Sequence, residues 1–183
     1  GSARLIPYLM KLKKPKVPKL LIGFSDITAL HLFIGQNWGW PTIHGRVLTQ
    51  MGFNAPDRSL YAELLRGEHK SLTYKGLIPM NDAARKVRTI TGKVTGGNLR
   101  LLECSIGTAW ELEARGKILF LEDVGERGYS IHRMLVHLSQ AGLLEGVRAI
   151  VLGDFTDGKE ADGTDRTKEA LESFAQETTI PVL

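Results

Sequence analysis

The chain has 183 residues, of which 43% are hydrophobic and 24% are charged, and its formal net charge is +4. This composition is typical of a globular protein with a sizeable core, and no apolar run approaches the roughly 20 residues of a membrane-spanning helix. A single cysteine, Cys104, excludes an internal disulfide framework and fits a reducing compartment. We therefore expect a cytoplasmic protein that does not bind a membrane.

Much of the positive charge lies in one proline-containing segment near the start of the chain. Its lysines are Lys11, Lys13, Lys14, Lys16 and Lys19. A phosphate-binding patch would use such lysines, but no aromatic residues are interleaved with them to stack on bases. We interpret the segment as a solvated connection that leads into a buried strand, and we expect no nucleic-acid partner.

The first clear elements are a strand and a helix joined by a sharp turn. Lys19–Gly23 is a short apolar run bounded by proline and glycine, which is typical of a strand buried in a parallel sheet. Ser25 and Asp26 then occupy the cap position of a helix. The residues that recur at helical spacing along it are Ile27, Leu30, His31 and Ile34. A strand, a turn and a helix thus follow one another within about fifteen residues.

Further elements follow in the order expected of an α/β protein. The patterns predict helices at 58–66, 131–142 and 165–178, strands at 87–94, 117–121 and 147–152, and the opening of another strand at 180–183. From about 68 to 88 the periodicity fades, which indicates an interdomain connection. We therefore expect an incomplete N-terminal domain at 1–75, a linker at 76–90 and an incomplete C-terminal domain at 91–183.

The turn Gly23-Phe24-Ser25-Asp26 carries the clearest chemical signal. A serine between a buried strand and a helix N-terminus is presented at the carboxyl edge of the sheet, where sites of open α/β folds lie. The amides that follow it can hold a developing oxyanion. The usual nucleophile elbow has glycine two residues after the serine, and this chain has Ile27 there. From the residues alone, a serine that merely caps a helix remains an equal alternative.

Several other segments carry recognisable motifs in a fixed order. Together with Gly23–His31 they are Gly1–Leu5, Thr42–Gly45, Thr95–Leu99, Gly116–Asp123, Tyr129–Leu135 and Leu152–Phe155. In this order they resemble the motifs of the LD-carboxypeptidases, also called muramoyltetrapeptide carboxypeptidases. Gly1-Ser2 can alternatively be a cloning remnant, which leaves that one match open.

The resemblance implies a serine hydrolase with a Ser-His-Glu triad and an α/β fold. The fold is an amidotransferase-like (Rossmann-like) N-terminal domain with a parallel sheet, followed by a smaller, mainly β C-terminal domain with helices. Motif matching assigns the nucleophile to Ser25, one oxyanion-hole amide to the backbone of Asp26, and the triad acid to Glu122. A carboxylate at a strand's end can accept the Nδ1 proton of the base. Without the resemblance, Glu122 is more simply a surface acid or a partner of Arg133.

Two further expectations concern the acid and the base. Side chains alternate along a strand, so Glu122 and Asp123 should point to opposite sides, and the family motif chooses Glu122. The family's catalytic histidine follows a strand that begins Ile-Pro-Val, and this chain stops at Leu183 within that strand. None of the five histidines, His31, His44, His69, His132 and His137, matches that motif. We therefore expect a fragment lacking both ends, inactive alone, whose catalytic histidine lies beyond Leu183.

His44 is weighed separately because it precedes a glycine and follows a β-like pair. A replacement base would have to reach within about 3 Å of the Ser25 hydroxyl, so we favour a structural or substrate-contacting role. We also assign a substrate-contacting role to Asn98. The tryptophans Trp38, Trp40 and Trp110 could stack on a ligand, but tryptophans at such spacing usually fill cores.

The expected function is release of the terminal D-alanine from cell-wall muropeptide tetrapeptides in peptidoglycan recycling, by cleavage of an L-D bond. Ser25 would form an acyl-enzyme that water hydrolyses, so the reaction needs no cofactor and no metal. The expected partner is a muropeptide or short peptide, and a homodimer stays open. One alternative is a microcin C immunity-type hydrolase of the same family, with aromatics that sandwich an adenine. The other is a non-catalytic binding fragment that keeps the cleft without the triad.

Overall fold

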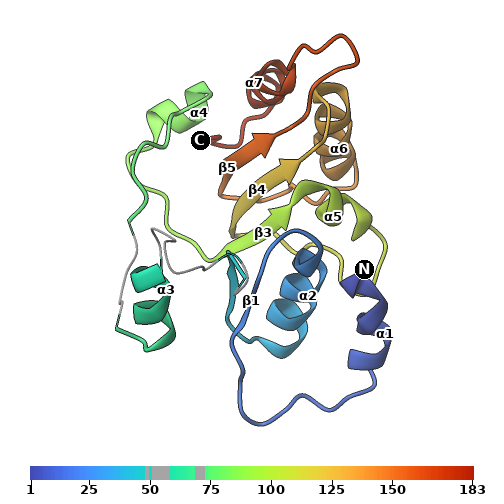
Figure 1. Ribbon diagram of the computed structural model, residues 1–183. Helices are drawn as coiled ribbons and strands as arrows, with labels where there is room; N and C mark the ends of the chain where they lie inside the picture. The colour runs from blue at the N-terminus through green and yellow to red at the C-terminus, as the bar shows by residue number, and fades with distance from the viewer. Residues whose placement is uncertain (48–49, 51–57, 69–72) are drawn as a thin grey trace.

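The computed structural model describes residues 1–47, 50, 58–68 and 73–183, and it contains two parallel sheets (Figure 1). β1 (Leu21–Gly23) pairs with β2 (Thr42–His44). The second sheet has the order β3-β4-β5, formed by β3 (Val94–Asn98), β4 (Ile118–Val124) and β5 (Ala149–Thr156). Parallel strands with helical crossovers confirm the α/β class. His69 lies outside the described residues.

Short helices surround β1 and β2 in the first part of the chain. The chain opens with η1 (Ser2–Leu5) and α1 (Ile6–Leu9), and the lysine-containing segment that follows is exposed, as expected of a solvated connection. After β1 come η2 (Ser25–Ile27), α2 (Thr28–Phe33) and the π-helical turn η3 (Ile34–Trp38). α3 (Arg58–Leu65) lies beyond β2.

Three helices pack with the second sheet to form most of the core. They are α5 (Leu99–Cys104), α6 (Gly128–Gln140) and α7 (Thr167–Glu177). The expected apolar face of α6 is buried at Ile131, Met134, Leu135 and Leu138, which confirms the sequence pattern. Leu119 and Leu121 of β4 are fully buried, and each such side chain contributes about 1.5–3 kcal/mol of hydrophobic stabilisation. This core fixes the strand ends that carry the site.

The strand predicted at 87–94 is wrong, because the strand is Val94–Asn98 and contains two consecutive glycines. Glycine is depleted in strands, so propensity points away from this segment. Here Gly96 and Gly97 adopt φ angles of 120° and 140°, which side chains rarely adopt. A Cβ at Gly96 would also collide with the carbonyl oxygen of Phe120 in β4. Close backbone approach, rather than propensity, therefore decides where β3 lies.

The segment expected to be an irregular connection contains a helix, α4 (Asp82–Lys86). Asn81 caps it by accepting a hydrogen bond from the amide of Ala84 (2.9 Å). The Asn81 Nδ2 also donates to the carbonyls of Ala175 (3.0 Å) and Ile180 (2.8 Å). Contacts about a hundred residues away in sequence thus stabilise this short helix.

The last residues of the chain continue the second sheet. Val182 forms a parallel bridge with Ile150 of β5, and the Leu183 amide donates to the Ile150 carbonyl (3.0 Å). The opening of a further strand at 180–183 is therefore confirmed.

The two parts of the chain meet where β1, β3 and β4 end. α2 contacts both β2 and β3, and the Asn98 amide donates to the Thr28 Oγ1 (3.1 Å). The carboxyl ends of parallel strands are where open α/β folds build their sites.

Candidate active site

Ser25 stands in a strained turn directly after β1. Its φ of 55° lies in the left-handed region, which a residue other than glycine adopts only at a cost. Phe24 before it is fully extended, and η2 begins at Ser25 itself. Ser25 is exposed, although Gly23 before it and most of α2 after it are buried. This geometry is that of a nucleophile elbow, which presents a hydroxyl above the sheet edge.

Close packing at Gly23 shapes the same turn. A Cβ at Gly23 would lie 2.8 Å from the Ile27 Cγ2, so only glycine lets the chain fold back over itself here. In the sheet, Gly23 pairs with His44, and its carbonyl accepts a hydrogen bond from the Gly45 amide (2.9 Å). The turn is therefore fixed to β2 immediately before the serine.

The first residues of the chain pack against the other side of this turn. The Ser2 amide donates to the Asp26 Oδ2 (2.6 Å), and the Ser2 Oγ donates to the Asp26 carbonyl oxygen (2.5 Å). A Cβ at Gly1 would lie 2.5 Å from the Asp26 Oδ1. The Gly1-Ser2 segment, part of the Gly1–Leu5 motif, thus lies beside the turn.

Glu122 and Asp123 leave β4 on opposite sides, as side-chain alternation predicts. Asp123 shares its face with the buried Leu119 and Leu121 and is itself only 4% exposed. Glu122 shares the other face with Phe120, and a Cβ at Gly153 would contact both of them. The β4–β5 register shifts between Leu121 and Asp123, so Glu122 stands at a β-bulge, a device that re-aims side chains near active sites.

The Glu122 carboxylate faces His44 at the end of β2. The His44 Nε2 lies 3.4 Å from the Glu122 Oε1, and the two side chains are 22% and 15% exposed. Phe120 contacts the same imidazole, with ring centroids 5.5 Å apart. The structure therefore brings together the predicted acid and a histidine that the motifs did not pair with it.

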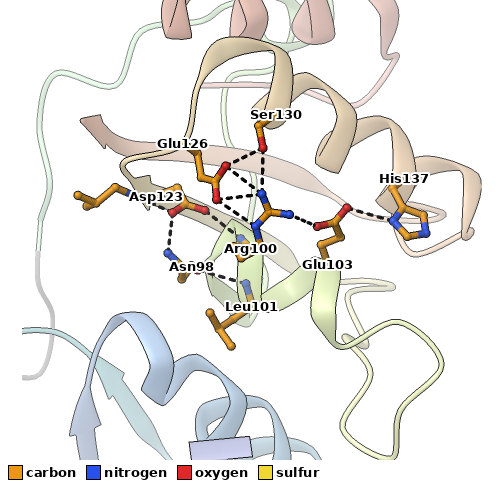
Figure 2. Close-up of polar contacts among 9 residues, drawn as sticks. Asn98, Arg100, Leu101, Glu103, Asp123, Glu126, Ser130 and His137 are labelled. Carbon is orange, nitrogen blue, oxygen red and sulfur yellow. Dashed lines mark hydrogen bonds and ion pairs between the residues drawn. The ribbon is translucent and has the colours of Figure 1, made fainter. Parts of the chain in front are cut away.

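Asp123 serves as an anchor between β4 and the start of α5. Its Oδ1 accepts hydrogen bonds from the Asn98 Nδ2 (3.0 Å) and the Val124 amide (2.8 Å), and its Oδ2 accepts from the Arg100 amide (2.9 Å). Burial raises the pKa of Asp123, and these hydrogen bonds oppose the rise without cancelling it. Asp123 thus joins the end of β4 to the end of β3 and the start of α5 (Figure 2).

Arg100 extends this anchor to α6 (Figure 2). It forms a bidentate pair with Glu126, with Nε to Oε1 at 3.0 Å and Nη2 to Oε2 at 2.9 Å, and also contacts Glu103 (Nη1 to Oε2, 2.7 Å). The Ser130 Oγ donates to the Glu126 Oε2 (2.6 Å). Burial raises the pKa of Glu126, but the hydrogen bonds from Ser130 and Arg100 outweigh it and leave the pKa below its ordinary value. The loop after β4 is thus tied to two helices.

Comparison with known proteins identifies the family. Residues 91–183 match the LD-carboxypeptidase C-terminal domain, and residues 1–45 match the LD-carboxypeptidase N-terminal domain. The first match alone covers half of the chain. The chain belongs to the LD-carboxypeptidase family. A relative from Rickettsia conorii, named as a carboxypeptidase, is 48% identical over the whole chain, and the chain spans 57% of that relative's length. The murein tetrapeptide carboxypeptidase of Pseudomonas aeruginosa is 33% identical over 90% of the chain and 55% of that protein.

Solved structures of the LD-carboxypeptidase family share this fold. The muramoyltetrapeptide carboxypeptidase from Oxalobacter formigenes has a TM-score of 0.69 and 26% identity, over 90% of this chain and 57% of that one. The wild-type apo microcin C7 self-immunity protein has a TM-score of 0.74 and 26% identity, over 100% of this chain and 63% of that one. Both branches of the family that the sequence suggested are thus represented among its structural neighbours.

The remaining histidines of the described residues lie in other environments. The His31 Nε2 is 2.9 Å from the Gly23 carbonyl, and burial lowers the pKa of His31, with a further lowering from His44 and an opposing effect of that hydrogen bond. His132 and His137 lie on α6, 3.7 Å from Glu177 and 3.2 Å from Glu103 respectively. Among the described histidines, His44 is the one recorded in contact with Glu122.

Asn98 is 6% exposed and caps α5. Its Oδ1 accepts from the Leu101 amide (3.1 Å), while its Nδ2 donates to Asp123. These bonds use one of the two Nδ2 hydrogens and hold the side chain within the protein. The observed contacts of Asn98 are therefore those of a helix cap that also braces Asp123.

A cavity of about 600 Å³ reaches His44, and neither Ser25 nor Glu122 is among its lining residues. α2, β2, β3 and β4 contribute to it, and its lining includes His31, Trp40, His44, Gly96 and Phe120. The tryptophans Trp38, Trp40 and Trp110 are at most 8% exposed, and Trp38 packs on Trp40 with ring centroids 5.0 Å apart. As expected, they belong to the core, although Trp40 also forms part of the cavity wall.

Within residues 1–47, 50, 58–68 and 73–183, no group of three His, Cys, Asp or Glu side chains is arranged to hold a metal ion. In the same ranges, no helix has the length and apolar character needed to cross a membrane.

The sequence did not indicate three of the contacts around the site. The Arg100–Glu126 pair, the His44–Glu122 contact and the packing of Gly97 on His44 all join residues from different elements. Of the three, only the packing of Gly97 on His44 has a sequence feature that could have revealed it. That feature is the glycine pair in Thr95–Leu99, because glycine in a strand often marks close backbone approach.

Proposed function

We propose that this chain supplies the nucleophile and the triad acid of a serine carboxypeptidase that cleaves an L-D peptide bond. The substrate is a cell-wall muropeptide tetrapeptide, and the product is free D-alanine, released during cytoplasmic peptidoglycan recycling. The observation that carries the proposal is the φ of 55° at an exposed Ser25 between β1 and α2. Strain of this kind persists where function requires it.

Each residue has one task in the proposed reaction. The Ser25 Oγ attacks the scissile carbonyl and gives its proton to a histidine base, and the Asp26 N–H stabilises the oxyanion. Collapse of the tetrahedral intermediate breaks the C–N bond, and D-alanine leaves with the proton from the base. Water then hydrolyses the acyl-enzyme. Glu122 orients the base and stabilises its cationic form.

The proposed base is a histidine in a Gly-His pair that follows the strand opened by Ile180-Pro181-Val182. Parallel pairing of Val182 with Ile150 of β5 supports this, because it directs the following residues to the same sheet edge as the carboxyl ends of β4 and β5. The proposed domains, 1–75 and 91–183 with a linker at 76–90, put Ser25 and Glu122 in different domains. The reaction would then take place between them.

The test is the release of D-alanine by the complete protein. A muropeptide tetrapeptide ending in D-alanine is compared with the same peptide ending in L-alanine, and free alanine of each hand is measured. We expect turnover of the first peptide and little of the second, because the proposed specificity is for an L-D bond. Equal hydrolysis of both peptides, or of neither, would refute the proposal.

A second candidate is a hydrolase of the microcin C immunity type. It is favoured by the 29% identity to the Escherichia coli microcin C7 self-immunity protein, which extends over 100% of this chain and 61% of that protein. Against it, the three tryptophans are buried in the core and do not form an open stacking pair. A peptidyl-nucleotide substrate in the same assay separates the two, and failure to turn over either substrate would leave a non-catalytic binding role.

A further inference from the structure

His44 is held in place by both sheets and by α2. It ends β2 in register with Gly23, two residues before Ser25, and its ring lies between those of His31 and Phe120, with centroids at 5.9 Å and 5.5 Å. Gly97 of β3 leaves the room that this ring needs, because a Cβ at that position would lie 3.0 Å from the His44 Nδ1. A ring packed from three directions has little freedom to swing toward a substrate.

The His44 Nε2 can donate a hydrogen bond, and the Glu122 Oε1 can accept one. Among the described residues, the buried Glu122 Oε1 has no hydrogen-bond partner, and the His44 Nε2 lies 3.4 Å from it. A buried carboxylate oxygen without a donor is unfavourable, because the loss of its hydration is then not compensated. A movement of about half an ångström would bring the pair to the 2.7–2.9 Å of a charge-assisted hydrogen bond.

We propose that His44 is a positioning residue for the triad acid: its Nε2–H holds the Oε1 of Glu122 and leaves the other carboxylate oxygen for the base. This inference rests on the proposed function of Glu122. The proposed base has to receive the Ser25 proton. His44, which holds Glu122 from the β2 side, therefore has a different task from that base. The orientation of the His44 ring matters because it sets the direction of the Glu122 carboxylate. A carboxylate that is turned away would leave the base in the wrong tautomer or position.

The groups around this pair come from every element packed against it. His31 faces His44 from α2, Glu122 faces it from β4, and β3 contributes Gly97 and β1 contributes Gly23, neither of which titrates. The Gly23 carbonyl accepts from the His31 Nε2, so His31 directs its proton away from Glu122. His44 is therefore the donor available to Oε1 among these neighbours.

The first experiment compares two replacements of His44 in the complete protein. His44→Phe keeps the ring shape without a donor, and His44→Gln keeps an N–H donor near the position of Nε2. We expect His44→Phe to lower kcat by about 10- to 100-fold with KM unchanged, the range for residues that orient a catalytic ligand. His44→Gln should recover most of this loss. His137→Phe is the matched control, because His137 also contacts a glutamate but lies on α6, and its kcat should equal that of the wild type.

A double-mutant cycle identifies the residue through which His44 acts. In a Glu122→Gln background, His44→Phe should cause no further loss of kcat, because residues that act as a unit are not additive. Additive losses, or equal losses for the Phe and Gln replacements, would overturn the positioning role. A rise in KM alone would make His44 a substrate contact and would overturn it as well.

An NMR measurement separates this inference from the proposed function. Nitrogen-15 spectra of the complete protein report the protonation of each imidazole nitrogen without any turnover. We expect the His44 Nε2 to carry a proton whose resonance moves in Glu122→Gln. A bare Nε2, or a resonance insensitive to Glu122, would refute the contact even if D-alanine is released. If the contact is seen and no peptide is cleaved, the proposed function fails and the pairing stands.

Discussion

The two strand ends that carry the site are held in different ways. At the end of β1, Ser25 is exposed and strained, and the backbone of its turn is shaped by the close packing of Gly23 on Ile27 and by hydrogen bonds from Gly45 and Ser2. At the end of β4, Glu122 is mostly buried, and its neighbour Asp123 accepts two hydrogen bonds from the end of β3 and the start of α5 and a third from the Val124 amide. The proposed nucleophile is thus presented by backbone geometry, whereas the proposed acid is placed by a network of side chains.

The largest expected effect is at the end of β1. Ser25→Ala in the complete protein should lower the rate of D-alanine release by about 10⁴- to 10⁶-fold, because triad members act as a unit. Its melting temperature should stay close to the wild-type value, since Ser25 is exposed and alanine removes only the hydroxyl. Substantial residual turnover would show that the strained turn has another purpose.

The next effect distinguishes the two acids at the end of β4. Glu122→Gln should lose about 10⁴-fold in kcat, by analogy with neutralisation of a triad acid, with little change in stability. Asp123→Asn places an amide where the carboxylate accepts from the Arg100 amide, so it should cost about 1–3 kcal/mol of unfolding free energy. Its loss of activity should stay below about 100-fold. The reverse ranking in kinetics and denaturation would assign the triad acid to Asp123.

A smaller effect is expected where the two regions touch. Gly97→Ala would put a Cβ 2.7 Å from the Thr28 Oγ1, at a φ of 140° that alanine avoids. We expect a destabilisation of about 1–3 kcal/mol, the usual cost of overpacking. Gly107→Ala is the control, because Gly107 also has a positive φ, 73°, but has open space around it. Equal melting temperatures for the two variants would show that the contact with Thr28 and His44 is unimportant.

The smallest effect concerns the outer part of the network and depends on pH. Glu126→Gln removes the bidentate pair with Arg100, which is 41% exposed, so screening reduces the loss to about 1 kcal/mol at neutral pH. Because the folded-state pKa of Glu126 is lowered, its contribution is present above the carboxyl's ordinary pKa of 4.5 and is lost as pH falls through the lower folded value. Chemical denaturation at several pH values should show the deficit shrinking below about pH 4.5. A deficit that does not depend on pH would mean the ion pair contributes nothing.

The same contrast explains what the sequence could predict. The strand, turn and helix around Ser25 were predictable because their signals are local: an apolar run, a glycine and a change of period within about fifteen residues. The alternation of Glu122 and Asp123 was predictable for the same reason. Choosing Glu122 as the acid required the family motif, because nothing local distinguishes the two carboxylates.

Features that depend on distant contacts were missed. β3 was placed too early because its glycines oppose strand propensity, and the close approach of Gly96 to Phe120 appears only when β4 is present. α4 was missed because Asn81 gains its partners from Ala175 and Ile180, far along the chain. The Arg100–Glu126 pair spans 26 residues and follows no periodic pattern.

The most direct test of the account is to trap the covalent intermediate. The complete protein is treated with an aryl phosphonate ester analogue of a peptide ending in D-alanine, from which the attacking serine Oγ displaces the aryl oxide. The protein is then digested and sequenced by mass spectrometry. The account predicts one adduct, on Ser25, that forms in the wild type and is lost or greatly slowed in Glu122→Gln. An adduct on another serine or on Cys104, or labelling of Ser25 at the same rate without Glu122, would contradict it.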